Sequence, residues 1–518
     1  MLSTPIMRSS ETLLTPRPIT KAVSKTRNNP ENNASSNRHS PQEQRLTKNQ
    51  LIGWTVILGI SFTFVCTSFA ALQNILSSLF IESGIGVKSL ICVYAVAAIS
   101  PLYSQFFVNR LTPNWVIVVS FVMTALYITV YFYPRIYTLT AAGILLGLLL
   151  GPLRCASTSF LVQTAGKLTA SSTDVSRELT IRRQFGHFTI FINSGQVWGN
   201  LLTSLLLHYG DDIYIYPTGP KLTNGPSSDF SPPVNVANPS LSRTMVNPSL
   251  CNADHCKKWE VFRNSIPFAF IVPSNVSLML ISVYLGLAFV GVALATSLLD
   301  KFDIREEGAE RVTFVETAKS YLLSFIDPQL RLVFPLIFFC GLQYGFIVAD
   351  FTRSYISCSL GMEAVGYALM IMGLTHTLSA FLVYQVPKCI NRLIIAFVGF
   401  SFHGGLLTIL WLWRPIKEDI VIFNIITAVW GVCSAIWEAL TTSFIIKTSG
   451  NDLHPALLSH YSILSLALSL AFASSFYLCT EIKLYILIST LILSIGPYSL
   501  AEYRLHQQNK TQERTAVL

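Results

Sequence analysis

The chain has 518 residues, of which 51% are hydrophobic and only 12% charged, with a mean hydropathy of +0.51. Soluble globular proteins carry about 25% charged residues, so this composition excludes an ordinary water-soluble domain and predicts a polytopic membrane protein. The formal net charge of +9 is explained below by the distribution of Lys and Arg around the spans, and it requires no nucleic-acid partner.

Residues 1–50 are expected to form a disordered cytoplasmic tail. They are rich in Ser, Thr, Asn, Pro and Arg and contain no sustained apolar run, so they cannot bury enough apolar surface to fold. The first apolar segment starts at Leu51 and is longer than the core of a secretory signal peptide. We therefore expect it to be retained as a span.

Apolar runs long enough to cross a bilayer predict twelve transmembrane helices, an all-α fold. In chain order they are 51–73, 89–108, 115–133, 138–163, 185–208, 276–299, 332–350, 364–385, 392–413, 419–446, 456–479 and 483–500. The first six form one half, 51–299, with one large outer loop at 209–275. A cytoplasmic linker with one surface helix, 300–331, precedes the second half at 332–500, and residues 501–518 form a short cytoplasmic tail.

An internal repeat relates the two halves. Residues 147–166 (GLLLGPLRCASTSFLVQTAG) align without a gap with residues 431–450 (GVCSAIWEALTTSFIIKTSG), at an offset of 284. A second set, Phe69, Ser77 and Gly84, matches Phe346, Ser354 and Gly361 at an offset of 277. Such agreement indicates duplication. Because six spans separate the copies, the halves have the same orientation, which predicts parallel repeats of the major-facilitator type.

Lys and Arg in the short loops predict the orientation of the chain. With a cytoplasmic N-terminus, the inner loops hold twelve of them and the short outer loops six, and the N-terminal tail adds eight inside. The six outer residues are Lys88, Arg135, Arg353, Arg414, Lys417 and Lys483. Both termini are therefore predicted to be cytoplasmic.

The large outer loop holds the sequence CNADHC, from Cys251 to Cys256. A local disulfide is one interpretation, because the loop faces an oxidising exterior or lumen. Asp254 and His255 allow a metal site, but the cluster lacks the second ligand pair of a zinc site, and free thiols are a third alternative. Most of the ten cysteines lie in spans and are expected to act as small apolar residues. Asn275 opens the glycosylation sequence NVS directly beside a span.

Small residues recur at helical spacing in several spans. They are Gly143, Gly147 and Gly151 in the fourth span, Gly195 and Gly199 in the fifth, and Gly341 and Gly345 in the seventh. In lipid such faces let helix backbones approach closely, so we expect tight packing. The alternative is that these helices rock against one another during alternating access.

Charged and polar residues inside the spans are the candidate functional residues, because burying a charge in a bilayer costs at least about 2.5–3.5 kcal/mol. Arg154 and Glu438 occupy equivalent positions in the two repeats. They could pair across the central cavity or each meet water separately. Asp350 and Arg353 stand at the outer end of the seventh span, where they could be ordinary interface charges. Asn193 and Gln196 of the fifth span could cross-link helices.

No enzymatic motif is found. A phosphate-binding P-loop, HExxH, GxSxG and a glycine-rich nucleotide fingerprint are all missing from the sequence. We expect no catalytic residues, no cofactor, no bound metal and no enzymatic activity.

Three segments resemble the Unc-93 family, the uncoordinated-type ion channel regulatory proteins. They are FINSGQVWGNLLTSLLL (191–207), VADFTRSYISCSLG (348–361) and AVWGVCSAIWEALTT (428–442). Residues 72–95 and 133–160 look like blocks of the first half of that family, and the similarity runs in order from about residue 51 to 500. The resemblance implies a twelve-span major-facilitator fold. Two residues depart from the expected pattern, Arg154 and Glu438.

The resemblance implies a regulatory subunit of a two-pore-domain potassium channel, bound through its spans in the plasma membrane. Two alternatives remain open: a major-facilitator transporter of a small solute, and a trafficking chaperone for a Toll-like receptor resident in the endoplasmic reticulum or endosomes. The loop VNRLTPNW (108–115) lacks the Asp and glycines of the facilitator gating motif, which argues against transport. Charges within the spans argue for it.

Overall fold

The computed structural model describes residues 48–79, 84–170, 177–213, 274–299, 313–385, 391–416 and 418–517, and within these ranges every regular element is a helix. This confirms the predicted all-helical class. Cys251 and Cys256, whose disulfide was one of the alternatives, lie outside the described residues, as do most of the N-terminal tail and most of the large outer loop.

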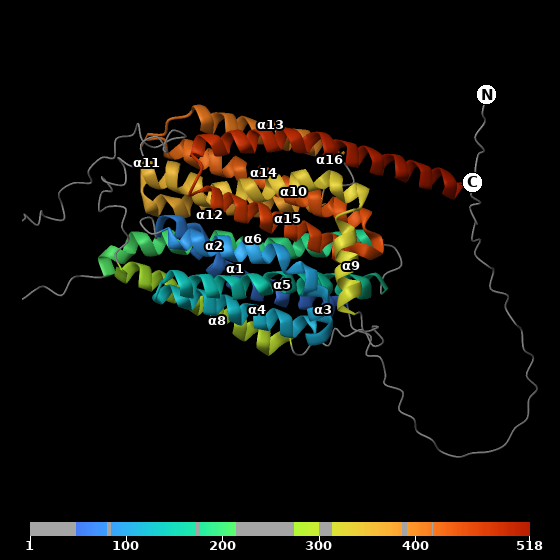
Figure 1. Ribbon diagram of the computed structural model, residues 1–518, viewed down its shortest axis with the longest axis horizontal. Coiled ribbons are helices and arrows are strands. Elements are labelled where there is room, and N and C mark those ends of the chain that lie inside the picture. The colour runs from blue at the N-terminus through green and yellow to red at the C-terminus, as the bar shows by residue number, and fades with distance from the viewer. Residues whose placement is uncertain are drawn as a thin grey trace, which may run out of the picture. The chain divides into compact units, whose positions relative to one another are not determined.

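The first part of the bundle contains α1 (Lys48–Leu79), α2 (Ile85–Ile99), α3 (Pro101–Leu111), α4 (Pro113–Thr129) with the short helix η1 (Val130–Phe132), α5 (Ile136–Ala170), α6 (Arg177–Ile213) and α8 (Ser274–Leu299). The second part contains α9 (Phe314–Ser324), α10 (Pro328–Phe346), η5 (Ile347–Ser357), α11 (Cys358–Leu360), α12 (Met362–Gln385), α13 (Arg392–Leu412), α14 (Ile420–Thr448), η6 (Gly450–Asp452), α15 (Leu453–Ser474) and α16 (Thr480–Val517). Most of these helices run along the long axis of the bundle, whereas α9 crosses one end (Figure 1).

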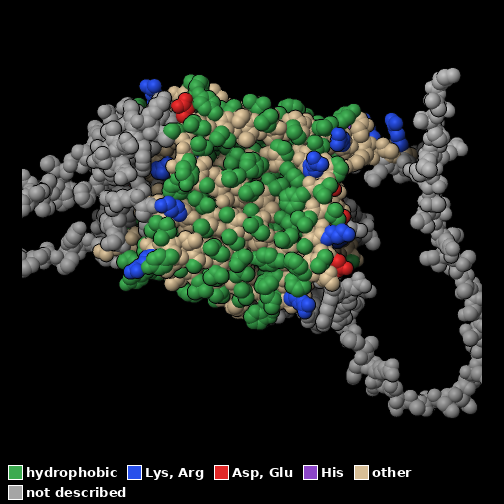
Figure 2. Space-filling model, in the orientation of Figure 1, with side chains coloured by type: hydrophobic (Ala, Val, Ile, Leu, Met, Phe, Trp, Pro, Cys, Tyr) green, Lys and Arg blue, Asp and Glu red, His purple; other side chains and the backbone are tan. Residues whose placement is uncertain are grey.

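Ten described helices are long and apolar enough to cross a membrane, or eleven if the bent pair α2 and α3 is one span. The protein is therefore a multi-pass membrane protein. The pair bends by 73° at Pro101, whose ring cannot continue the preceding helix without a clash. The visible face has hydrophobic side chains across its middle and Lys and Arg at its two ends (Figure 2), as expected when charges avoid hydrocarbon.

Helix α6 is absent from the apolar set because polar residues interrupt its 37 residues. It nevertheless packs against α1 and α12. A Cβ added to Gly366 of α12 would lie 2.5 Å from the Asn200 carbonyl oxygen of α6, so the two backbones approach closely. The two halves of the chain meet along this contact.

The repeat seen in the sequence has a counterpart in the backbone. Helix α5 begins at Ile136 and α14 at Ile420, which preserves the offset of 284. Gly84 and Gly361 each precede a helix, α2 and α12, and both have positive φ, 59° and 96°. Glycine adopts such angles without steric cost. A glycine therefore occupies the equivalent turn, directly before a helix, in both repeats.

Several helix ends differ from the predicted boundaries. Helix α1 begins at Lys48, inside the predicted tail, and α16 continues from the last predicted span through the polar C-terminal segment to Val517. Helix α9 lies in the linker between the halves. Its start is fixed by a capping box between Thr313 and Glu316, and hydrogen bonds from the Thr313 backbone N–H and hydroxyl lower the pKa of Glu316.

Candidate functional site: buried charges in the helical bundle

A π-helix, η5, continues directly from α10. Ten of its eleven residues are buried, the exception being Arg353. π-Helical turns are rare and frequently occur at functional sites, because they displace side chains from the regular helical register. The sequence prediction of a seventh span ending at residue 350 did not anticipate this segment.

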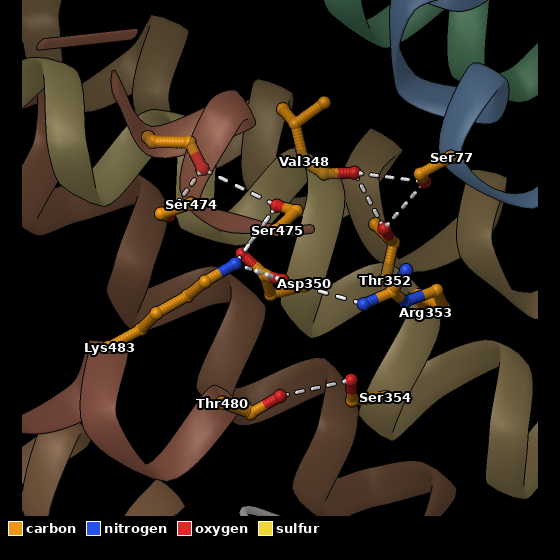
Figure 3. A network of polar contacts seen from close by, with 11 residues as sticks. Ser77, Val348, Asp350, Thr352, Arg353, Ser354, Ser474, Ser475, Thr480 and Lys483 are labelled. Atoms are coloured by element: carbon orange, nitrogen blue, oxygen red, sulfur yellow. Dashed lines mark hydrogen bonds and ion pairs between the residues drawn. The ribbon is translucent and has the colours of Figure 1, made fainter. Parts of the chain in front are cut away.

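Asp350 of η5 is the centre of a buried polar network, the Asp350 network, formed with Arg353, Ser475 and Lys483. Lys483 Nζ lies 2.7 Å from Asp350 Oδ1 and 2.9 Å from Ser475 Oγ. The Ser475 hydroxyl donates to Asp350 Oδ2 at 3.4 Å, and an Arg353 guanidinium nitrogen lies 3.9 Å from Oδ1. Figure 3 shows the two cations on opposite sides of the carboxylate.

The Asp350 network corrects two sequence expectations. Asp350 is only 1% exposed, so it is a buried ion-pair partner and not an ordinary interface charge. Lys483, which the sequence placed in an outer loop, lies in the first turn of α16 and is 5% exposed. A buried carboxylate requires a counter-charge, and this requirement was the signal that could have identified a lysine partner.

Contacts beside the Asp350 network join distant helices. The Ser77 hydroxyl of α1 donates to the Val348 carbonyl at 3.3 Å and lies 3.4 Å from the Thr352 hydroxyl, so the first half touches η5. Ser354 of η5 and Thr480 of α16 are 3.3 Å apart (Figure 3).

Two cysteines at this end of the bundle form disulfide bonds and do not act only as small apolar residues. Cys358 and Cys479, which follow η5 and precede α16, are both disulfide-bonded. By contrast, Cys66, Cys92, Cys155, Cys340 and Cys433 are free. The expectation that span cysteines act as small apolar residues is therefore wrong for Cys479, the last residue of the predicted span 456–479, whereas Cys358 lay outside the predicted spans.

Arg154 and Glu438 do not form a direct ion pair: no Arg154 nitrogen lies within 4.0 Å of a Glu438 carboxylate oxygen. Glu438 Oε2 instead lies 2.9 Å from His376 Nε2 of α12, which is within ion-pair distance. The angles at this contact are not those of a regular hydrogen bond. The Arg154 guanidinium stacks over the Tyr461 ring of α15, 5.2 Å from its centroid. The two charges are near enough to interact electrostatically.

Of the two predicted polar residues of α6, Gln196 links helices and Asn193 does not. Gln196 hydrogen-bonds the Tyr344 hydroxyl of α10 and accepts from Asn74 of α1 at 3.1 Å. Asn193 is 8% exposed, and its Nδ2 has no hydrogen-bond partner among the described residues. Gln196 thus connects both halves of the chain, and Asn200 extends the same network to Asn74 at 2.9 Å.

The predicted glycines lie at helix contacts. A Cβ on Gly147 of α5 would be 2.5 Å from the Val93 carbonyl oxygen of α2, and one on Gly199 of α6 would be 2.5 Å from that of Thr67 of α1. On α10, a Cβ on Gly345 would be 2.4 Å from the Ala471 Cβ of α15. The remaining predicted positions, Gly143, Gly151, Gly195 and Gly341, meet neighbouring helices at 2.4–3.1 Å.

Asn275, the possible glycosylation site, is exposed at the second residue of α8, and its modification stays a prediction. Within the ranges that the structure covers, no three His, Cys, Asp or Glu side chains are grouped so as to hold a metal ion.

Comparisons with known proteins show which proteins the chain resembles. No family model matches the chain. Protein unc-93 homolog A of Xenopus laevis is 27% identical over 467 residues, 89% of this chain and 95% of that protein. The putative potassium channel regulatory protein unc-93 of Caenorhabditis elegans is 24% identical over 85% of this chain and 59% of its own length. Among solved structures, the major facilitator superfamily transporter FucP in its outward conformation is similar with a TM-score of 0.53, at 12% identity, over 87% of this chain and 99% of that one.

The chain is an Unc-93-like protein with a major-facilitator fold. The sequence resemblance to the Unc-93 family is thereby confirmed. In this Unc-93-like chain, Asp350 and Arg353 of the Asp350 network fall within the segment 348–361, one of the three on which the resemblance was based. Glu438 falls within another, residues 428–442.

Proposed function

We propose that this Unc-93-like protein is a regulatory subunit of a potassium channel of the two-pore-domain type and modulates membrane excitability. The observation that carries this proposal is the similarity, over 85% of the chain, to a nematode protein named as a putative potassium channel regulator. The protein itself would be non-enzymatic.

Contacts between the halves support a scaffold rather than a transport cycle. A facilitator transporter must separate its halves at one end to admit a solute. Here Ser77 of α1 contacts η5, and the Ser204 hydroxyl of α6 donates to the Glu363 carbonyl of α12 at 2.8 Å. Gln196 adds a third connection, to Tyr344. Each of these contacts would have to break for the halves to part at that end.

For the topology we propose twelve crossings in two parallel halves of six, with both termini cytoplasmic. The candidate twelfth crossing is α6, whose 37 residues exceed the roughly 20 needed to span a bilayer. The disulfide-bonded Cys358 and Cys479 support this orientation, because disulfides persist in oxidising compartments and the excess of Lys and Arg puts the opposite end inside. We propose the plasma membrane as the residence.

The channel would bind to lipid-facing span surfaces. Gly286 of α8, Gly405 of α13 and Gly496 of α16 are exposed, and each has open space where a Cβ would lie. Exposed glycines allow the backbone of a partner helix to approach closely in lipid. These three positions lie on three different helices, so each variant serves as a control for the other two.

Co-purification tests this contact. A tagged full-length chain is co-expressed with a two-pore-domain potassium channel and extracted in mild detergent, with Gly286→Trp, Gly405→Trp or Gly496→Trp introduced one at a time. We expect the parent to capture the channel and at least one variant to lose it, while all three keep the parent's unfolding temperature. Failure of the parent to capture any such channel would contradict the proposal.

A further inference from the structure

Two polar side chains on the Gln343- and His376-facing side of α14 remain partly accessible. Along Cys433–Ile446, all of which the structure describes, only Ser434 and Glu438 are partly exposed. The two residues are four apart, so they lie on the same face of the helix. The Glu438 side chain keeps 37% of its surface accessible and that of His376 18%, although Trp437 and Ala439 on either side of Glu438 are buried. The polar contacts of this face, to Gln343 of α10 and His376 of α12, are made with other helices of the bundle.

Arg154 supplies the opposite charge from the other half of the chain. It lies near the middle of α5, and its guanidinium makes no hydrogen bond or ion pair with any residue that the structure describes; its contact is the Tyr461 ring. A guanidinium has five N–H donors, and leaving all of them without an acceptor within a membrane is costly. The donors are therefore available to a bound molecule.

Helix α15 connects the two charges. His460 and Tyr461 each interact electrostatically with both Arg154 and Glu438. His460 is 7% exposed, and its Nδ1 has no hydrogen-bond partner among the described residues. Glu438 also retains one carboxylate oxygen, Oε1, that contacts no described partner. A cation, a carboxylate oxygen and a ring nitrogen, none of them hydrogen-bonded to a described residue, thus lie within electrostatic reach of one another, and we infer that they face one space.

We propose that this space binds a small zwitterion of the amino-acid type. Its carboxylate would lie on Arg154, which can offer two parallel N–H donors, and its ammonium group on Glu438. A simple anion would place a second negative charge beside Glu438, and a simple cation would face Arg154. A molecule that carries both charges satisfies both residues. This inference goes beyond channel regulation and does not depend on it.

Thermal unfolding of the full-length protein in nanodiscs tests the proposal, because a ligand that binds only the folded state raises the unfolding temperature. The probes are glycine, β-alanine and 4-aminobutyrate, whose charges are increasingly far apart, with butyrate and butylamine as singly charged controls. We expect a saturable rise with at least one zwitterion and a smaller or no rise with either control. Because this measurement needs no channel, its result is independent of the proposed channel regulation. Zwitterion binding could be observed without channel regulation, and channel regulation without zwitterion binding.

Arg154→Gln and Glu438→Gln, which remove one charge with little change of size, should each abolish the rise. Arg154→Lys keeps the charge but loses the paired donors, so it should weaken the response without eliminating it. Arg135→Gln, at an exposed arginine outside the bundle, should leave the response unchanged. No response to any of the three zwitterions, an equal response to butyrate, or a response retained in Arg154→Gln would overturn the proposal.

Discussion

Lys483 Nζ lies 2.7 Å from Asp350 Oδ1, and both side chains are almost completely buried. The pair joins the first turn of α16 to the π-helix η5, which are 133 residues apart in the sequence. Ser475 at the end of α15 hydrogen-bonds both partners, so three segments of the second half converge on one carboxylate.

Removal of one partner of this pair should destabilise the protein strongly. Asp350→Ala leaves the Lys483 ammonium buried without its partner, and such losses cost about 3–5 kcal/mol. The double variant Asp350→Leu with Lys483→Met should recover much of the stability, because it removes both charges. Unfolding temperature in detergent and surface expression are the measurements.

The control is the exposed pair of His208 and Glu363, 3.3 Å apart with both side chains more than half exposed. Exposed pairs contribute about 0–1 kcal/mol, so Glu363→Ala should have little effect. If Asp350→Ala were as mild as Glu363→Ala, the Asp350 network would not stabilise the fold.

Glu438 should be coupled more strongly to His376 than to Arg154, because only His376 is within ion-pair distance. Two double-mutant cycles, His376→Gln with Glu438→Gln and Arg154→Gln with Glu438→Gln, measure the two couplings. We expect the first to exceed the second by about 1 kcal/mol or more in unfolding free energy, as close polar contacts show couplings of about 0.5–3 kcal/mol. Equal couplings, or recovery in the charge-swapped variant Arg154→Glu with Glu438→Arg, would favour direct pairing of the two repeat-related charges.

Gly431 should tolerate no side chain. A Cβ there would lie 2.2 Å from Thr375 Oγ1 and 2.4 Å from the Met372 carbonyl oxygen of α12. Gly431→Ala should therefore cost about 1–3 kcal/mol, as overpacking does. Gly404→Ala on α13 is the matched control, since nothing lies within 4 Å of the added Cβ. It should be neutral or stabilise by up to about 1 kcal/mol, because alanine favours helix over glycine. Equal losses at both positions would argue against the close contact of α14 with α12.

A tag inserted near residue 240 should be reached by an antibody from outside intact cells, whereas tags at either terminus should require permeabilisation. Two independent observations lead to this expectation: the inner loops hold more Lys and Arg, and Cys358 and Cys479 are disulfide-bonded. Labelling of a terminal tag on intact cells would contradict the proposed orientation.

The helical class and most span positions could be predicted from the sequence, because hydropathy depends only on local composition. The packing role of Gly147 was also foreseeable, since a small residue every fourth position on a span has one common use in lipid. The repeat offset of 284 residues likewise separates the first residues of α5 and α14 in the structure.

The partners of the charges could not be predicted in this way. Lys483 resembles a loop residue because it follows the polar start of α16, and its partner Asp350 lies on a distant helix. Equivalent repeat positions placed Arg154 and Glu438 opposite each other, but His376 lies closer to the carboxylate. The π-helix could not be predicted from the hydrophobic pattern, because the mixed polar and apolar sequence of Ile347–Ser357 does not indicate which type of helical turn it forms.

The most direct test of the regulatory role is a paired recording in cells that express a two-pore-domain potassium channel with and without this protein. The account predicts a change in potassium current amplitude or gating on co-expression, and no saturable solute uptake by the protein alone. Deletion of residues 1–45 should leave the current effect largely intact, since the spans make the contact. An unchanged current together with saturable uptake of a defined solute would contradict the account and identify the protein as a transporter.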